Sequence, residues 1–211
     1  MSPRPQLDPT AVAARRTAIL EATIAEIVRR GPDAVRLKDV AAAAGVSVGT
    51  VQYYFANRDD LLLEALSSHS RSVIDAIERL ARVDGSAWDR LRATFAAVPT
   101  VESYERRAIV WVELVAAARR NRILEQSVAE VFARWRDHFR SLIDLGIAEG
   151  SLTPQVDTSL IVDTLIAQID GFDLAIAAGR EGLTPDQVSA TLEATAAALL
   201  SVDSTAGARR P

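Results

Sequence analysis

The stretch AGVSVGTVQYYF, residues 44–55, joins a glycine turn to a short segment that is dense in polar side chains. Residues 37–44 and 47–55 each fit a helix of only about two turns, and Gly45 stands between them. Helices this short are marginal in water, so two in succession joined by a tight turn indicate a helix-turn-helix. We therefore predict a helix-turn-helix over residues 36–55.

One face of the second short helix is free to contact DNA. Helical spacing turns Val51 and Phe55 inward, and the second helix of such a unit enters the major groove of DNA. Residues at the starts of the neighbouring helices can reach phosphates. The candidate DNA-contacting residues are Arg36, Lys38, Ser47, Val48, Gly49, Thr50, Gln52, Tyr53, Tyr54 and Arg58.

Gln52 has the chemistry to read a base, because its amide can donate to and accept from the N6/N7 edge of adenine. A contact to phosphate or to solvent is the alternative for Gln52. Tyr53 and Tyr54 can donate their phenol O–H groups to phosphates, although Tyr54 also fits the core. Arg16 in the first helix either contacts a phosphate or belongs to a solvated helix face, and Arg15 has the same two alternatives.

The rest of the chain also repeats apolar residues with helical periodicity. We predict an all-α fold of about nine helices without strands, in two domains over residues 12–72 and 73–203. Asn57 and Thr184 are expected to cap helices, Thr184 with Gln187 three residues later. The expected long helices span residues 9–30, 58–82, 87–98, 101–119, 123–148, 158–178 and 185–201.

Composition limits the possible functions. The chain lacks cysteine, which excludes disulfides and thiolate chemistry, and it has no phosphate loop, HExxH or GxSxG motif. We therefore expect no enzyme activity and no cofactor or metal. The net charge is −4, but residues 1–72 hold nine basic against eight acidic side chains, so the acidic excess lies in the remainder. No long apolar run occurs, so a soluble cytoplasmic protein without membrane contact is expected.

The segment RLKDVAAAAGVSVGTVQYYFANRDDLL, residues 36–62, resembles the signature of the TetR family of transcriptional regulators. The segments WVELVAAARRN, WRDHF and QIDGFD resemble the BetI-type subgroup of that family. The resemblance implies three N-terminal DNA-binding helices and a larger helical domain that binds an effector and dimerises through its last two helices. The matching signature positions are Val40, Ala41, Ala44, Gly45, Val46, Ser47, Gly49, Thr50, Tyr54, Phe55, Leu61 and Leu62.

Three positions depart from the family signature. Gln52 stands where many members have tyrosine, which favours base reading over a backbone contact. Arg58 replaces the usual lysine and adds a planar fork suited to phosphate. Arg36 replaces the usual threonine, and an arginine cannot cap the helix that follows.

The C-terminal domain contains candidate ligand contacts among its aromatic and polar residues. Glu113 lies in an apolar run, where a carboxylate must be paired, neutralised or open to a cavity. Mid-helix Gly171 favours a close helix contact, such as a dimer interface. The acidic domain suggests a cationic or amphipathic effector. The candidate ligand contacts are Trp111, Glu113, Phe132, Trp135, Gln168, Asp170 and Phe172, for which core packing is the alternative.

These observations predict a homodimeric, ligand-responsive repressor that binds a pseudo-palindromic double-stranded DNA operator. Two other functions remain open. One is a helical small-molecule-binding protein whose DNA-binding module has degenerated, and the other is an architectural DNA binder without effector control.

Overall fold

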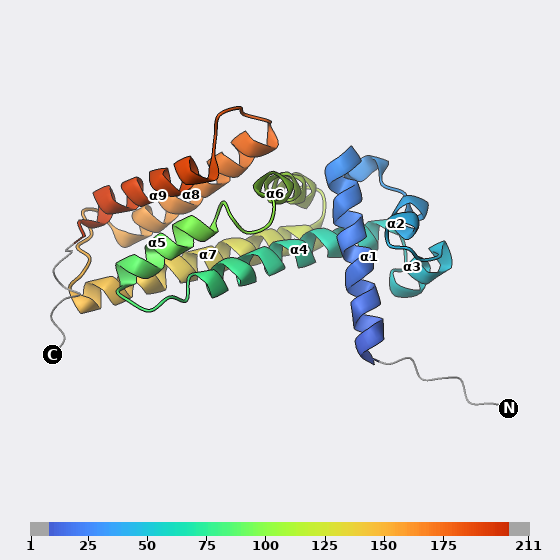
Figure 1. The fold of residues 1–211 in the computed structure, drawn as a ribbon, viewed down its shortest axis with the longest axis horizontal. Coiled ribbons are helices and arrows are strands. Elements are labelled where there is room, and N and C mark those ends of the chain that lie inside the picture. Colours follow the sequence, from blue (N-terminus) through green and yellow to red (C-terminus); the bar gives the residue numbers. More distant parts are fainter. Residues whose placement is uncertain (1–8, 203–211) are drawn as a thin grey trace. The chain divides into compact units, whose positions relative to one another are not determined.

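The computed structural model describes residues 9–202, and this part of the chain contains nine α-helices, one short 3-10 turn and no β-strand (Figure 1). The all-α prediction is confirmed. The chain divides into two compact units, Met1–His69 and Ser70–Pro211, and α4 contributes to both. The elements are α1 (Pro9–Arg30), η1 (Pro32–Ala34), α2 (Leu37–Ala43), α3 (Val48–Tyr54), α4 (Arg58–Leu80), α5 (Ala87–Ala97), α6 (Tyr104–Ala118), α7 (Arg122–Glu149), α8 (Thr158–Ala177) and α9 (Pro185–Leu200).

Side-chain caps explain where several helices begin. As predicted, Asn57 precedes α4 and its Oδ1 accepts from the Asp60 amide at 2.9 Å, while Thr184 and Gln187 form a capping box at α9. The predicted start of α6 at residue 101 is wrong. The amide of that valine still closes the preceding turn, and Ser103 caps a helix that begins at Tyr104.

In the first unit, apolar faces of α1 to α4 form the core. Val51 and Phe55 are almost fully buried, as the helical spacing predicted, together with Ile24 of α1 and Leu61 of α4. Gly45 has a φ of 64°, and the Val46 amide donates to the Ala41 carbonyl at 2.9 Å, which closes the turn between α2 and α3. The two short helices are therefore held as a helix-turn-helix.

In the second unit, α5, α7, α8 and α9 pack around a core in which the Phe95 and Phe139 rings stack with centroids 6.1 Å apart. Figure 1 shows α6 nearly end-on while these four helices run across the view, so α6 crosses them steeply. The most extensive contact between any two helices joins α6 to α8. Polar side chains buried between α6 and α8 therefore need hydrogen-bond partners within this interface.

Arg58 ties the start of α4 to the turn before α2. Its Nε donates to the Val35 carbonyl at 2.7 Å, its Nη2 to the Pro32 carbonyl, and its Nη1 pairs with Asp59 at 3.0 Å. These contacts use three of the five N–H groups of Arg58. Arg58 therefore has a structural role inside the first unit, and its expected phosphate contact stays a prediction.

Arg16 is also used inside the first unit. It forms an ion pair with Glu64 of α4, and its guanidinium carbon lies 5.2 Å from the centroid of the Phe55 ring. The Arg16 side chain is still 42% exposed, so both alternatives considered for it, a phosphate contact and a solvated helix face, stay open beside this ion pair. Arg15 is exposed.

Replacing Arg58 with alanine is expected to destabilise the first unit. The change leaves the buried Val35 carbonyl without a donor, and a hydrogen bond to a charged group contributes about 1.5–3 kcal/mol. Urea unfolding should show a loss of about that size, whereas Lys38→Ala, which removes an exposed charge near the same turn, should leave the free energy of unfolding unchanged. Equal stabilities of the two variants would contradict the assignment.

Candidate functional site

The outward face of α3 exposes four of the candidate DNA contacts together. Val48 is 38% exposed and Tyr53 73% exposed, and Gln52 lies between them on the same face. Gly49 has only the Ser47 hydroxyl near the position that a Cβ would take, at 3.7 Å, so the α3 backbone is open to close approach. This surface offers an amide, a phenol, an apolar side chain and bare backbone on one short helix.

Ser47 and Thr50 are engaged with each other. The Ser47 Oγ accepts from the Thr50 amide at 3.0 Å and lies 2.9 Å from the Thr50 hydroxyl. Ser47 is thus the N-cap of α3, and Thr50 is half-buried. Both candidates have a structural role in holding the start of the helix, in addition to any contact with DNA.

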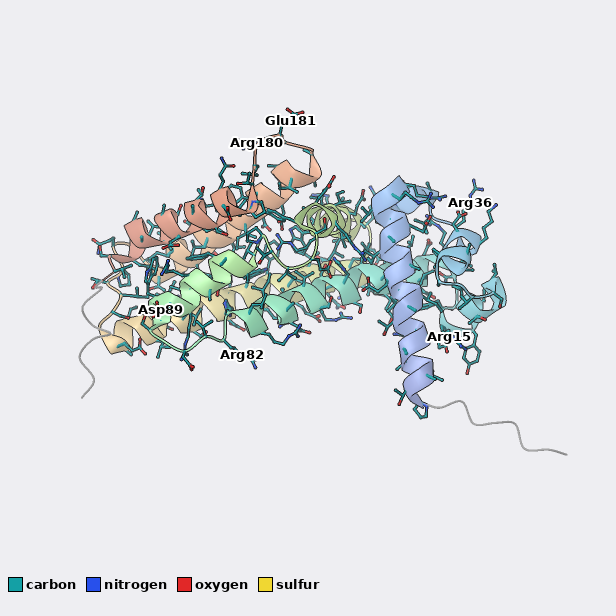
Figure 2. The ribbon with its side chains drawn as sticks, in the orientation of Figure 1. Arg15, Arg36, Arg82, Asp89, Arg180 and Glu181 are labelled. Carbon is teal, nitrogen blue, oxygen red and sulfur yellow. The ribbon has the colours of Figure 1, made fainter. Side chains whose placement is uncertain are left out.

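The flanking candidates are arranged around this helix. Arg36 and Lys38 are both exposed at the start of α2, and Arg36 makes no capping bond, as the loss of the family threonine predicted (Figure 2). Tyr54 is half-buried and meets the ring of Tyr53 edge-on, with centroids 5.2 Å apart. Arg36 and Lys38 thus supply exposed positive charge in the first unit, and Tyr54 belongs partly to the core.

In the second unit, α6 and α8 share a buried ion pair that the sequence analysis missed. The Arg107 Nη2 donates to the Asp173 Oδ1 at 2.7 Å, with side chains only 5% and 8% exposed. Arg107 also donates to the Val98 carbonyl, and its guanidinium lies over the Tyr104 ring at 4.5 Å. Burial raises the pKa of Asp173, and the Arg107 guanidinium opposes that rise. No signal in the sequence pairs these two residues, which lie 66 positions apart.

Three predicted ligand contacts meet beside this ion pair. The Trp111 Nε1 donates to the Asp170 Oδ1 at 3.1 Å, and the Trp111 ring meets the Phe132 ring edge-on with centroids 5.6 Å apart. Burial raises the pKa of Asp170 to about 6, against the Trp111 hydrogen bond that lowers it, and the nearby Asp173 adds to the rise. We call Trp111, Phe132 and Asp170 the aromatic–acid cluster.

The remaining predicted ligand contacts lie differently. Trp135 stacks on the buried Phe139 at 5.3 Å, and Phe172 packs against the core, so both contribute to core packing. The Gln168 Oε1 is buried and has no hydrogen-bond partner among the described residues. Glu113 is half-buried and has an interaction within the chain.

The fold and the α3 surface define a helix-turn-helix protein with a separate helical domain, a class whose members bind DNA. The family model for bacterial regulatory proteins of the tetR family matches residues 19–65. The model for the C-terminal domain of BetI-type transcriptional repressors matches residues 87–201, more than half of the chain. The chain belongs to the TetR family, with a BetI-type C-terminal domain, and is a DNA-binding transcriptional regulator of the ligand-responsive repressor type.

Individual relatives agree with this assignment. The HTH-type transcriptional regulator PksA of Bacillus subtilis is 29% identical over 162 residues, which cover 76% of this chain and 77% of PksA. A putative regulator of Saccharomonospora viridis, solved in complex with choline, is 26% identical with a TM-score of 0.77, over 86% of this chain and 95% of that one. A putative TetR-family regulator from Rhodococcus is also 26% identical, with a TM-score of 0.73 over 89% and 98%. None of the described helices is long and apolar enough to cross a membrane.

The raised pKa of Asp170 predicts a pH-dependent effect of Asp170→Asn on stability. Between pH 3.8, the ordinary pKa of an Asp side chain, and about pH 6, Asp170 is protonated in the folded state but ionised in the unfolded state. The stability that this protonation contributes is therefore lost as the pH rises through that range. The neutral amide escapes this loss. The rise in pKa from 3.8 to about 6 would correspond to about 3 kcal/mol without solvent. Solvent screening of this partly buried group reduces the expected effect to about 1 kcal/mol.

Chemical unfolding at two pH values measures the effect. The Asp170→Asn variant should be more stable than the wild type by about 1 kcal/mol near neutral pH and indistinguishable from it below about pH 4. Glu130→Gln, an exposed change of the same charge, should alter stability at neither pH. A variant that is less stable than the wild type at neutral pH would contradict the assignment.

Proposed function

We propose that this regulator reads its operator through the outward face of α3, with Gln52 as the base-reading residue. The observation that supports this most strongly is the exposed row of Val48, Gly49, Gln52 and Tyr53 on a helix whose inner face is fully buried. Arg36 and Lys38 contact phosphates beside it. Phosphate contacts position the protein, and base contacts select the sequence.

Gln52→Ala tests the base-reading role. Loss of a bidentate amide contact should relax selectivity at a single base pair by about 1–3 kcal/mol. Lys38→Ala should instead weaken binding to all DNA sequences equally and reduce the salt dependence of binding. Gel shifts with a set of single-base operator variants measure both effects. A Gln52→Ala variant that keeps the wild-type preference at every position would rule out the assignment.

We also propose that the last two helices pair with those of a second copy to form a homodimer. The exposed row Leu160, Thr164, Ala167, Gly171 and Leu174 on α8 repeats at intervals of four and three residues, the spacing of a helix–helix seam. Apart from its chain neighbours and the nearby backbone of α8, no atom of residues 9–202 lies within 4 Å of the position that a Cβ on Gly171 would take. A helix of a second copy could therefore approach the α8 backbone closely at Gly171. Small residues, including Ala194 and Ala198, continue the exposed face on α9.

A charge placed in this seam should dissociate the dimer. Leu160→Glu is expected to convert the protein to monomers in sedimentation experiments, because a carboxylate would be buried without a partner. Ile123→Glu is a matched control, since Ile123 is 60% exposed and Leu160 59% exposed, but Ile123 lies on α7. A Leu160→Glu variant that sediments as the wild type does would contradict the proposed interface.

The aromatic–acid cluster supports an effector that is a small organic cation. A Trp ring, a Phe ring and a carboxylate together favour a positive charge, and quaternary ammonium ligands are recognised in this way. The S. viridis relative solved with choline supports the same class of ligand. Binding at the cluster would favour a conformation in which the two recognition helices no longer match the half-sites, which releases the operator.

Choline titrations followed by calorimetry test the effector site. Trp111→Ala and Asp170→Asn should each weaken binding about tenfold or more, which is 1.4 kcal/mol or more, while Glu130→Gln, the same charge change on an exposed position, should not. Absence of saturable binding of choline and of related quaternary amines to the wild type would overturn the proposed ligand class.

We propose no catalytic role for this regulator, and we propose that it acts in the cytoplasm, because a repressor must reach chromosomal DNA.

The gel shifts also test the two alternative functions. A protein with a degenerate DNA-binding module would show no operator preference in them. An architectural binder would give salt-sensitive binding to all DNA alike.

A further inference from the structure

A cavity of about 410 Å³ lies in the second unit away from the aromatic–acid cluster. The last turns of α4, the loop after it, α5 and α7 form its wall. This volume lies within the range of small-molecule pockets, which is about 300–1,000 Å³. The wall residues are Glu78, Ala81, Arg82, Val83, Asp84, Arg90, His138 and Leu142.

Two guanidinium groups of this wall have no counter-ion. Within residues 9–202, neither Arg82 nor Arg90 forms a side-chain hydrogen bond or an ion pair, and the Arg90 Nε is buried without an acceptor. The Glu78 Oε2 is paired with Arg134 at 2.8 Å. A buried donor such as the Arg90 Nε is normally satisfied, and a guanidinium matches the two oxygens of an oxyanion. The wall thus contains the carboxylates Glu78 and Asp84 beside these two arginines.

His138 adds a hydrogen-bond acceptor to the same wall. The Thr94 hydroxyl lies 3.0 Å from the Arg90 carbonyl, to which it can donate, and 2.9 Å from the His138 Nε2. We assign Nε2 as the donor in the second contact, because a hydroxyl that donates its proton to a carbonyl can only accept from the imidazole. With the proton on Nε2, the Nδ1 of the neutral ring is an acceptor. Burial lowers the pKa of His138, with Arg134 adding to the decrease and Glu78 opposing it, which keeps the ring neutral near physiological pH.

We propose that this cavity is a second small-molecule site, which binds an oxyanion carrying an O–H group, such as hydrogen phosphate or a hydroxycarboxylate. Arg82 and Arg90 hold the anionic oxygens, and His138 Nδ1 accepts from the O–H. The site is separate from the aromatic–acid cluster and binds a ligand of the opposite charge. It does not depend on the proposed effector or on the proposed operator contacts.

Calorimetry of the full chain with inorganic phosphate, citrate and sulfate at matched ionic strength tests the site. Phosphate or citrate should bind saturably at one site per chain, and the tighter of the two identifies the acid group. Sulfate carries no O–H at neutral pH and should bind more weakly than phosphate. Sulfate binding as tight as that of phosphate would overturn the role of His138.

Variants then locate the site. Arg82→Gln and Arg90→Gln should each weaken binding about tenfold, and Arg180→Gln, which removes the same charge from the loop after α8, should not. Figure 2 shows Arg82 and Arg180 on opposite sides of the second unit in that view. Arg82 is exposed, so its variant keeps the test valid if Arg90→Gln fails to fold. Absence of binding by the wild type, or equal losses in Arg82→Gln and Arg180→Gln, would overturn the proposal.

Discussion

A seven-residue helix cannot be stable in water by itself, and the recognition surface of this protein depends on what holds α3 in place. Its inner face is fixed by burial of Val51 and Phe55, and its first turn by the Ser47 cap. Arg58 then fastens the start of α4 to the turn before α2. Because these contacts occupy the inner face of α3, the exposed side chains of Val48, Gln52 and Tyr53 remain available to contact bases.

In the second unit, a buried ion pair lies at the interface of α6 and α8. Burying Arg107 and Asp173 costs desolvation energy, which their mutual contact and the Val98 carbonyl offset. Nearby, Asp170 accepts a hydrogen bond from Trp111 but forms no ion pair within the part of the chain that the structure describes. A raised pKa at such a carboxyl is the expected consequence, and it marks the aromatic–acid cluster as a place suited to a positively charged ligand.

The sequence predicted the helices and the helix-turn-helix because local signals determine them: helical periodicity, caps such as Asn57, and the glycine turn. It predicted Trp111, Phe132 and Asp170 as ligand contacts, and the structure brings these three together. It could not find the partners of Arg58 or of Arg107, because these contacts join residues 23 and 66 positions apart. The partner of an arginine depends on which groups the tertiary fold brings near it, and residue spacing along the chain does not reveal this.

The central claim is that two copies of α3 read a two-fold symmetric DNA site. Selection of bound fragments from a random double-stranded DNA library by the wild-type protein tests it most directly. The account predicts that the recovered sequences share an inverted repeat whose half-sites lie about one helical turn, or a little more, apart. Recovery of fragments with no common sequence, or with a single unrepeated half-site, would contradict it.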